Sequence, residues 1–390
     1  MPYLIISTLL CIAAIVTVYW IHNRATLEII TTPAPPPPGG PRISVIIPAR
    51  NEAHNIKRCV EAVLMQDYPN FEVLVLDDRS TDATPAILME LSKDDSRLVV
   101  LFGEELPEGW AGKPHALYQA ARSATGEWLC FVDADTFLGP NTLSAVFHGA
   151  NKTGADLYTI MTLQIVETFW EKVAQPIVFS AIATGFSPRK INDPKSRDAI
   201  ANGQFIFIKR SVYDAVGGHE AIKNQIVEDK ALAEQVKWNG YRLVMAAGYS
   251  LAKTRMYTSL ATLWEGWTKN IYLGLKDSSG MMLLGAFGAL ISLIVTLFMP
   301  IWPLLGLAWY ANGGGMPALL VVGEALLVWA VMLQMRARAA HAMRISRWYA
   351  LTTPLGTALF GAMMFTSTWK SLFGKGVTWK GRTYDKKTVR

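Results

Sequence analysis

Two aspartates stand one residue apart at the end of an apolar run. The stretch WLCFVDADTF, residues 128–137, starts as a buried strand and ends in Asp133 and Asp135. In an extended segment, side chains two residues apart point to the same side, so both carboxylates can approach one divalent cation or one bound phosphate. The Asp-x-Asp pattern alone is weak. Its position at a strand end, together with a further acid at Asp78, requires a compensating cation or hydrogen-bond donors.

A second polar cluster occurs in VLVLDDRSTDAT, residues 73–84. The Ser, Thr and Asp residues at 80–82 are natural helix caps, so a helix start explains part of the cluster. Capping does not explain Asp77 and Asp78. We predict that Asp78 accepts hydrogen bonds from a base or a ribose.

Short apolar strands alternate with helical patterns in the region that carries these acids. Strands and helices of this length predict an α/β fold with a mainly parallel sheet and helices on both faces. Such sheets bind ligands at the carboxyl ends of their strands, where the polar clusters follow. The strands are expected at 43–48, 71–76, 98–102, 128–132, 157–163 and 205–208, with helices at 82–91, 114–124 and 227–240.

The composition indicates that part of the chain lies in a membrane, because 51% of the residues are hydrophobic and only 17% are charged. Residues 3–21 carry no charge over the length of a membrane span, and they lack the basic start and cleavage site of a signal peptide. Three further apolar blocks follow at about 281–311, 317–335 and 349–369. We therefore expect one N-terminal and two to three C-terminal transmembrane segments.

The charge is distributed unevenly along the chain. From Arg336 to Arg390 there are 11 Lys and Arg residues and one acid, Asp385, so the net charge of +6 comes from the membrane part and nucleic acid is a poor explanation of it. Arg24 and the arginines of the connector at 336–347 predict a multi-pass protein of the cell membrane whose globular part faces the cytoplasm. A full crossing at 349–369 would place the basic tail outside. We expect a re-entrant or interfacial hairpin around Pro354 and Gly356 instead.

The expected organisation follows from these patterns. The prolines of TTPAPPPPGGP, residues 31–41, favour a semi-rigid spacer. The three cysteines, Cys11, Cys59 and Cys130, suit unpaired thiols in a reducing compartment. The predicted segments are an anchor at 1–24, a Pro-rich linker at 25–41, a globular domain at 42–257, an interfacial amphipathic helix at 258–280, a transmembrane region at 281–370 and a basic tail at 371–390.

Six short motifs occur in a fixed order: SVIIPARNE, VLVLDDRSTDAT, EGWAGKPHAL, FVDADT, ANGQFIFIKR and IVEDKAL. In this order they resemble family 2 glycosyltransferases, which are inverting enzymes of the GT-A fold, over residues 43–275. The membrane blocks and the ending VTWKGRTY resemble a subgroup that includes carotenoid-acid, hopanoid-associated and ceramide glycosyltransferases. The resemblance implies a Rossmann-like mixed sheet, a nucleotide-sugar donor such as a UDP-sugar, and a lipid acceptor.

The resemblance also assigns roles to individual residues. Without the resemblance, Glu228 and Asp229 can also be explained as acids in the first turn of a helix, where they interact favourably with the helix dipole. The implied nucleotide-sugar contacts are Pro48, Ala49, Glu52, Asp78, Lys113 and Asp133; the implied ligands of Mg²⁺ or Mn²⁺ are Asp135 and Asp133; and the implied catalytic residues are Asp229, as the base, and Glu228.

One stretch departs from the family pattern. Many processive members carry Gln-x-x-Arg-Trp where this chain has WEGWTK, residues 264–269. This difference favours a single transfer over polymer synthesis. Two interpretations stay open for the stretch: Trp267 stacks on the acceptor and Lys269 contacts phosphate, or the tryptophans pack in an interfacial helix.

The sequence lacks the motifs of several other enzyme classes, and two alternative functions stay open. The sequence has no phosphate loop of the Gly-x-x-x-x-Gly-Lys-Ser/Thr type, no Gly-x-Ser-x-Gly elbow and no zinc spacing. The first alternative is transfer to a polyprenyl phosphate, whose phosphate needs no strong base. The second is a membrane component that binds nucleotide sugar or moves a glycan without catalysing transfer.

Overall fold

The computed structural model describes residues 2–27, 29, 31–275, 290, 294, 297–373, 377–379 and 382–384. The chain divides into two compact units, which are described separately below. The globular unit comprises Leu27–Ile165, Phe186–Met256 and Thr378–Arg390, and the helical unit comprises Met1–Thr26, Val166–Gly185 and Tyr257–Val377.

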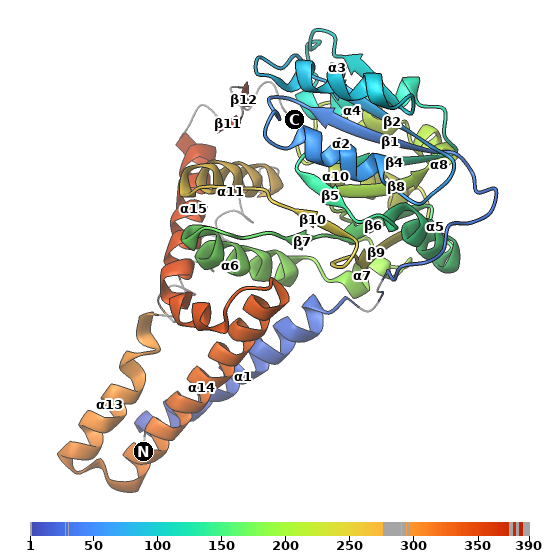
Figure 1. Cartoon of the computed structure of the whole chain (residues 1–390). Coiled ribbons are helices and arrows are strands. Elements are labelled where there is room, and N and C mark those ends of the chain that lie inside the picture. Colours follow the sequence, from blue (N-terminus) through green and yellow to red (C-terminus); the bar gives the residue numbers. More distant parts are fainter. Residues whose placement is uncertain are drawn as a thin grey trace. The chain divides into compact units, whose positions relative to one another are not determined.

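A seven-stranded sheet with the order β3-β2-β1-β4-β8-β6-β9 forms the centre of the globular unit (Figure 1). Strands β3, β2, β1 and β4 are parallel, β8 is antiparallel to both neighbours, and β6 is parallel to β9. The predicted α/β fold with a mainly parallel, mixed sheet is therefore confirmed. The strands are β1 (Ile43–Ala49), β2 (Phe71–Asp77), β3 (Leu98–Phe102), β4 (Trp128–Val132), β6 (Leu157–Met161), β8 (Phe205–Lys209) and β9 (Leu243–Ala247).

Alternate side chains of the central strands enter two hydrophobic clusters. Val45 and Ile47 of β1 join the cluster on one face, while Ile46 joins the cluster on the other. This two-residue period is expected of a strand buried on both faces, and each fully buried Val or Ile contributes about 1.5–3 kcal/mol. The first cluster contains residues of α2 (Ile56–Leu64), α3 (Thr84–Asp94) and α5 (Thr142–Thr153), and the second contains residues of α4 (Gly112–Ser123), α7 (Pro188–Asn192), α8 (Arg210–Ala215) and α10 (Glu228–Trp238).

A small second sheet, which the sequence patterns did not predict, lies in the same unit. Its strand order is β5-β10-β7, with β5 at Thr136–Leu138, β10 at Ala252–Thr254 and β7 at Leu163–Gln164. Strand β5 is antiparallel to β10 and begins directly after Asp135. The sheet therefore fixes the strand that leaves the aspartate pair. The short helix α9 (Gly218–Ala221) completes the described helices of this unit.

The Pro-rich segment is fastened to the globular unit at both of its ends. Its first part pairs with the end of β9, where the backbone N–H of Thr31 donates to Ala247 O at 2.9 Å. At its other end, Tyr68 Oη donates to Pro41 O at 2.8 Å. The segment expected as a spacer thus lies against the unit, which begins at Leu27.

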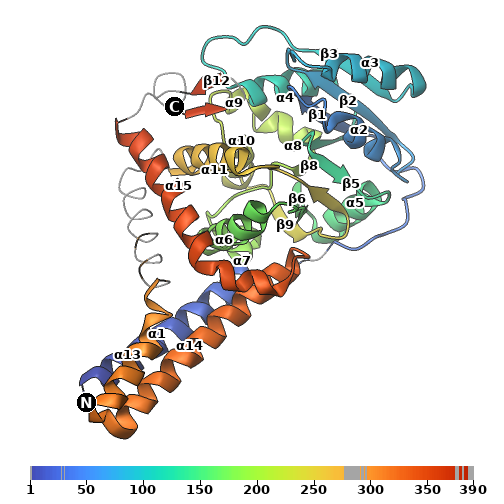
Figure 2. The ribbon, with the colours of Figure 1, turned by 60° about the vertical axis from the view of Figure 1, so that its left-hand side comes forward.

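The helical unit is built on long apolar helices (Figure 2). Helix α1 packs along α14, and α13 is joined to α14 through a kink, η1, in which Gly313 has φ 85°. In the described part of the chain, two helices have the length and composition of a membrane span, Pro2–Trp20 and the kinked Ile301–Ala342. The helices are α1 (Pro2–Ala25), α6 (Phe169–Gly185), α11 (Leu260–Leu275), α13 (Ile301–Trp309), η1 (Tyr310–Gly314), α14 (Gly315–Ala342), η2 (Arg347–Thr352) and α15 (Thr353–Phe373).

These helices only partly match the expected C-terminal segments. The predicted block at 281–311 lies largely outside the described residues. The block at 349–369 is not among the candidate spans, although α15 is long enough. Three or four transmembrane segments are therefore not confirmed. Within the segment expected as a tail, β11 (Val377–Trp379) and β12 (Arg382–Tyr384) form a two-stranded sheet.

The hairpin expected around Pro354 and Gly356 is wrong, because α15 runs through both positions without reversing. Pro354 stands in the first turn of the helix, where the missing backbone N–H of proline costs no hydrogen bond. Gly356 permits a close approach of α15 to α6, since a Cβ atom there would lie 2.6 Å from Val173 O. The sequence signals therefore mark a helix start and a helix contact.

Candidate active site

The loops that follow β1 and β2 are tied together by side-chain hydrogen bonds. Asn51 and Arg79 both have left-handed backbones, with φ values of 53° and 58°. The backbone N–H of Asn51 donates to Ser80 Oγ at 2.9 Å, and Asn51 Oδ1 accepts from the N–H of Thr81 at 2.8 Å. An asparagine tolerates this conformation better than most residues, because its short amide bonds locally. The two loops therefore form one surface at the carboxyl edge of the sheet.

The helix-capping interpretation does not account for residues 80–82. Asp82 Oδ1 accepts from the N–H of Thr84 at 3.0 Å just before α3, whose N-cap is Ala83 without a side-chain cap. Asp82 Oδ2 accepts from the N–H of Ala53 at 3.1 Å, and Thr84 Oγ1 accepts from the N–H of Glu52 at 2.9 Å. The same residues thus hold the β1 loop in place.

Asp78 lies beside Ala49 at the ends of neighbouring strands. Its backbone N–H donates to Ala49 O at 2.7 Å, and its own carbonyl accepts from Arg50 Nη1 at 2.7 Å. The residue is buried, with 6% of its surface exposed. Pro48 is half-buried on β1, and the carboxylate of Glu52 accepts from Asn55 Nδ2 at 3.1 Å on the following turn. The structure thus gathers four of the predicted nucleotide-sugar residues: Pro48, Ala49, Glu52 and Asp78.

Asp133 and Asp135 lie in a turn, so the extended geometry assumed for them is wrong. The N–H of Thr136 donates to Asp133 O at 2.9 Å, which closes a four-residue turn at the end of β4. The backbone N–H of Asp133 donates to Gln204 O at 3.4 Å. The aspartates are therefore positioned by a turn held between β4, β5 and the start of β8.

Lys113, in the first turn of α4, contacts two carboxylates that are far apart in sequence. Its Nζ lies 2.6 Å from Asp133 Oδ1 and 2.6 Å from Glu228 Oε1. Burial alone lowers the pKa of Lys113, but the two carboxylates outweigh it and raise that pKa well above its ordinary value. The compensating positive charge that the acids require is thus supplied by this ammonium group. The Lys113 to Glu228 contact was not visible in the sequence.

Asp229 begins α10 next to Glu228 and accepts two backbone hydrogen bonds. Its Oδ2 accepts from the N–H of Gly203 at 3.0 Å, and its Oδ1 accepts from the N–H of Lys230 at 2.7 Å. Burial and the charge of Glu228 raise the pKa of Asp229 to about 6, against the opposing effect of Lys113 and the two hydrogen bonds. A first-turn acid that serves only the helix dipole needs neither the contact with Gly203 nor this pKa.

The turn Asn202-Gly203-Gln204 connects the base candidate to the aspartate turn. A Cβ atom on Gly203 would lie 2.8 Å from Asp229 Oδ2, so any larger residue there must displace the Asp229 side chain. The side chain of Gln204 is buried and accepts from Gln164 Nε2 at 2.9 Å and from Thr162 Oγ1. The pairing of Gly203 with Asp229 and the buried network of Gln204 were missed in the sequence, where the only signal was a turn-like Asn-Gly before a strand.

The donor set of the aspartate turn fits a hard divalent cation. Mg²⁺ and Mn²⁺ prefer oxygen ligands, and next to a bound diphosphate they need only one or two carboxylates from the protein. Asp133 and Asp135 provide these carboxylates at a strand end. In the part of the chain that the structure describes, no group of three or more His, Cys, Asp or Glu side chains is arranged to hold a metal ion alone.

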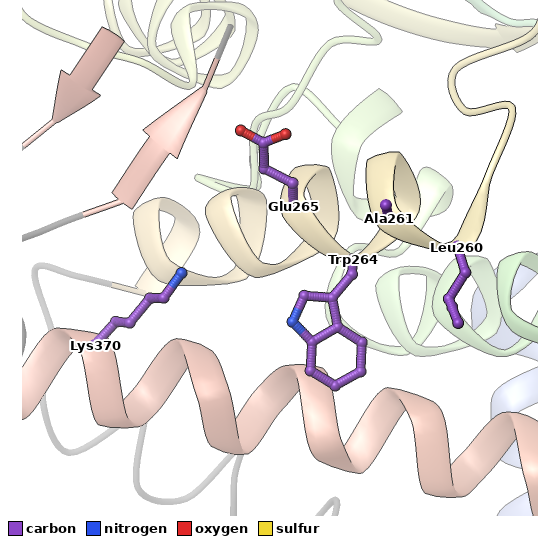
Figure 3. Close-up of a pocket in the computed structure, with 5 residues that line it drawn as sticks. All are labelled: Leu260, Ala261, Trp264, Glu265 and Lys370. Atoms are coloured by element: carbon purple, nitrogen blue, oxygen red, sulfur yellow. The ribbon is translucent and has the colours of Figure 1, made fainter. Parts of the chain in front are cut away.

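The residues of WEGWTK lie in the helical unit, on α11. Trp267 is 5% exposed, and its ring packs edge to face against Phe179 and Tyr257, with centroid distances of 5.7 and 5.8 Å. The packing interpretation accounts for this tryptophan. Trp264 instead extends toward α15 and lines a shallow apolar groove with Leu260, Ala261, Glu265 and Lys370 (Figure 3).

Comparison with known proteins finds similarity to glycosyltransferases. Residues 44–217 match the family model described as glycosyl transferase family 2. The chain is 27% identical over 352 residues to 4,4'-diaponeurosporenoate glycosyltransferase of Staphylococcus aureus strain MRSA252, with 88% of each chain covered. It is 26% identical over 351 residues to the protein of the same name from strain USA300, again with 88% of each covered.

The fold also matches a solved glycosyltransferase. Mannosyltransferase PcManGT from Pyrobaculum calidifontis, in complex with GDP-Man and Mn²⁺, aligns with a TM-score of 0.54 and 20% identity, over 96% of this chain and 99% of that one. This likeness shows a GT-A-like fold. Residues 44–217 thus match glycosyl transferase family 2, and over 88% of its length the chain resembles carotenoid-acid glycosyltransferases.

Proposed function

We propose that this protein is an inverting, cation-dependent glycosyltransferase that moves a sugar from a nucleoside diphosphate, a UDP-sugar in the first instance, to a membrane lipid or lipid-soluble acceptor. The observation that carries the proposal is the arrangement around Asp229. The half-buried carboxylate of Asp229, with a pKa raised to about 6, lies next to Glu228, whose own carboxylate shares Lys113 with Asp133. One site thus combines a proton acceptor with groups suited to a diphosphate.

Asp229 acts on the acceptor, and the other assigned residues act on the nucleotide-sugar donor. Asp229 accepts the proton of an acceptor hydroxyl as that oxygen bonds to the anomeric carbon and the bond from this carbon to the phosphate oxygen breaks. A single displacement inverts the anomeric centre. Lys113 donates to the departing diphosphate once a donor is bound, and Asp78, Ala49, Pro48 and Glu52 surround its nucleoside.

A divalent cation bound at the aspartate turn would neutralise charge that develops on the diphosphate. Asp135 is assigned as its direct ligand, as the family resemblance implies, and Asp133 lies 2.6 Å from Lys113 Nζ. Loss of Asp135 should therefore weaken cation binding more than loss of Asp133.

A lipid acceptor in a membrane is supported by the two helices with the composition of a span and by relatives named for glycosylation of 4,4'-diaponeurosporenoate. The basic residues at 336–347 support a globular unit that faces the cytoplasm. Trp267 and Lys269 are assigned no more than a supporting role, since the ring of Trp267 is buried among helices.

The proposal is tested by incubating membranes that contain the protein with Mn²⁺ and a panel of labelled nucleotide sugars, then extracting the lipids. Asp229→Asn and Asp135→Ala are run alongside. Label that enters the lipid fraction from one donor and is lost in both variants would identify the sugar and support the assigned roles. Loss of a general base typically costs 10² to 10⁴-fold in rate.

The same assay separates the alternatives. If Asp229→Asn retains nearly full activity, the acceptor is already ionised, as a polyprenyl phosphate or a carboxylate is, and the base role of Asp229 fails. If purified protein binds a nucleotide but lipids of the native host never become labelled, lipid glycosylation itself fails.

A further inference from the structure

Three aromatic side chains form an exposed ladder on the last turns of α15. Phe365, Trp369 and Phe373 are 66%, 56% and 71% exposed, and each follows the previous one by four residues, so all three lie on one face. The rings of Phe365 and Trp369 stack with centroids 6.1 Å apart, and those of Trp369 and Phe373 lie 4.7 Å apart. So large an exposed aromatic stripe marks an interaction surface.

The opposite face of α15 is occupied by protein. Met363 and Ser367 are fully buried, and the helix packs against α6 and α11 within the helical unit. Helix α15 thus has one protein face and one aromatic face. Helix α1 differs, because its large exposed side chains surround the helix and are aliphatic over most of its length.

The composition of the aromatic face identifies its partner. The last turns read FTSTWKSLF. Beside the three exposed rings, Thr366 and Lys370 are half-buried, whereas Ser367 and Thr368 are buried. Such a mixture is poorly suited to the hydrocarbon interior, whereas tryptophan and lysine are enriched at the headgroup level of a bilayer. Consistent with this, α15 does not have the hydropathy of a span.

The groove between α11 and α15 has the same character. Leu260, Ala261 and Trp264 give it an apolar wall beside the charged Glu265 and Lys370. Figure 3 shows the indole of Trp264 extending toward α15 while the Lys370 ammonium extends toward α11. An ammonium at the edge of an apolar surface attracts the phosphates of anionic lipids. Lys370 lines the groove and directly follows Trp369 of the ladder, so both features suit the headgroup region of a bilayer.

We infer that α15 lies along the membrane interface, with Phe365, Trp369 and Phe373 among the lipid headgroups, rather than crossing the bilayer. The inference rests on the membrane association proposed above but not on the transfer reaction. It predicts equal depths for the three positions. A spanning α15 would separate Phe365 from Phe373 by about 12 Å, because a helix rises 1.5 Å per residue.

The test is depth measurement by spin labelling of the full chain in vesicles that contain anionic lipid. Cys59 and Cys130 are fully buried and stay in place, Cys11 is replaced by alanine, and single cysteines are introduced as Phe365→Cys, Trp369→Cys and Phe373→Cys. Matched controls are Ile5→Cys, Leu9→Cys and Val16→Cys on α1, all more than half exposed. All the labelled positions are exposed, so the substitutions leave the packed faces intact.

Accessibility of each label to oxygen and to a water-soluble nickel complex gives its depth. We expect the α15 labels to agree within about 3 Å near the headgroups, while the labels at positions 5 and 16 of α1 differ by about 16 Å along the helix axis. A depth difference near 12 Å along the ladder would overturn the inference, as would labels reached only from water. Either result would leave the lipid-glycosylation assay unaffected, so the two proposals fail separately.

Discussion

The globular and helical units place their polar and apolar groups in opposite ways. In the globular unit, the acids at the carboxyl edge of the sheet contact partners from distant parts of the chain, such as Lys113 with Asp133 and Glu228. In the helical unit, large aliphatic and aromatic side chains face outward along α1, α13 and α14. Glu324 of α14 is a notable charged group on those helices, and it accepts from two hydroxyls of α1.

This difference fits the surroundings that the proposed function gives each unit. Outward apolar side chains are costly in water and favourable in lipid, whereas paired charges at a strand end are favourable where a charged substrate arrives. Under the proposed function, the globular unit carries out the transfer and the helical unit holds it at the membrane. Substitutions in the first should change rates, and substitutions in the second should change membrane behaviour and stability.

The largest effect is expected from Lys113→Met. The variant removes the ammonium between Asp133 and Glu228 and the cation offered to the diphosphate, so we expect a loss of 10² to 10³-fold in kcat/KM for the nucleotide sugar. The matched control is Lys209→Met, which breaks another lysine to aspartate contact, to Asp156 at 2.9 Å, on β8. Equal losses in both variants, measured by initial rates, would show that Lys113 acts only through folding.

A smaller loss is expected from Gly203→Ala. The new methyl group would lie 2.8 Å from Asp229 Oδ2 and displace the base. Misplacement of a reacting group by about 1 Å can cost up to 10²-fold, so we expect kcat to fall by about 10 to 10²-fold with the donor KM nearly unchanged. Gly323→Ala in α14 is the control, because no atom lies within 4 Å of its added methyl group. An unchanged kcat for Gly203→Ala would show that Gly203 does not position Asp229 for catalysis.

The next prediction concerns the dependence of kcat/KM on pH. Burial and Glu228 hold the pKa of Asp229 at about 6, so the base is protonated, and kcat/KM falls tenfold per pH unit, as the pH drops below about 6. Glu228→Gln removes a charge that raises this pKa, and the acid limb should then move to lower pH. A limb that moves to higher pH, or that is absent in the wild-type profile, would contradict the assignment of Asp229.

The fold and much of the site could be predicted because their signals are local. The strand ends, the aspartate pair and the first-turn acids of α10 are each contained within a few residues, and buried parallel strands have an unmistakable apolar pattern. The order of these motifs then supplied the family. The predicted strands and α10 fall within one or two residues of their observed bounds, whereas the helix predicted at 82–91 is observed at Thr84–Asp94.

The features that were missed depend on distant parts of the chain. The contact of Lys113 with Glu228 joins residues on two helices, the second sheet brings β5 to β10, and Gly203 meets Asp229 across 26 positions. Proline and glycine were also misinterpreted in α15, where a local turn signal is compatible with a helix start. Local sequence cannot distinguish these cases, because the tertiary partner decides between them.

The smallest effect tests the helical unit alone. Glu324 accepts from Thr8 Oγ1 at 2.6 Å and from Ser7 Oγ, and Ser7 is 2% exposed. Glu324→Leu leaves the Ser7 hydroxyl buried without this acceptor, which costs about 1 kcal/mol between membrane helices and should lower Tm by a few degrees in detergent. Glu324→Gln keeps an acceptor and a donor of the same length, so its Tm should match the wild type. In both variants the transfer rate per folded molecule should be unchanged, because none of the proposed catalytic groups lies on α1 or α14. A rate that falls in Glu324→Leu while Tm holds would show that the helical unit also shapes the chemistry.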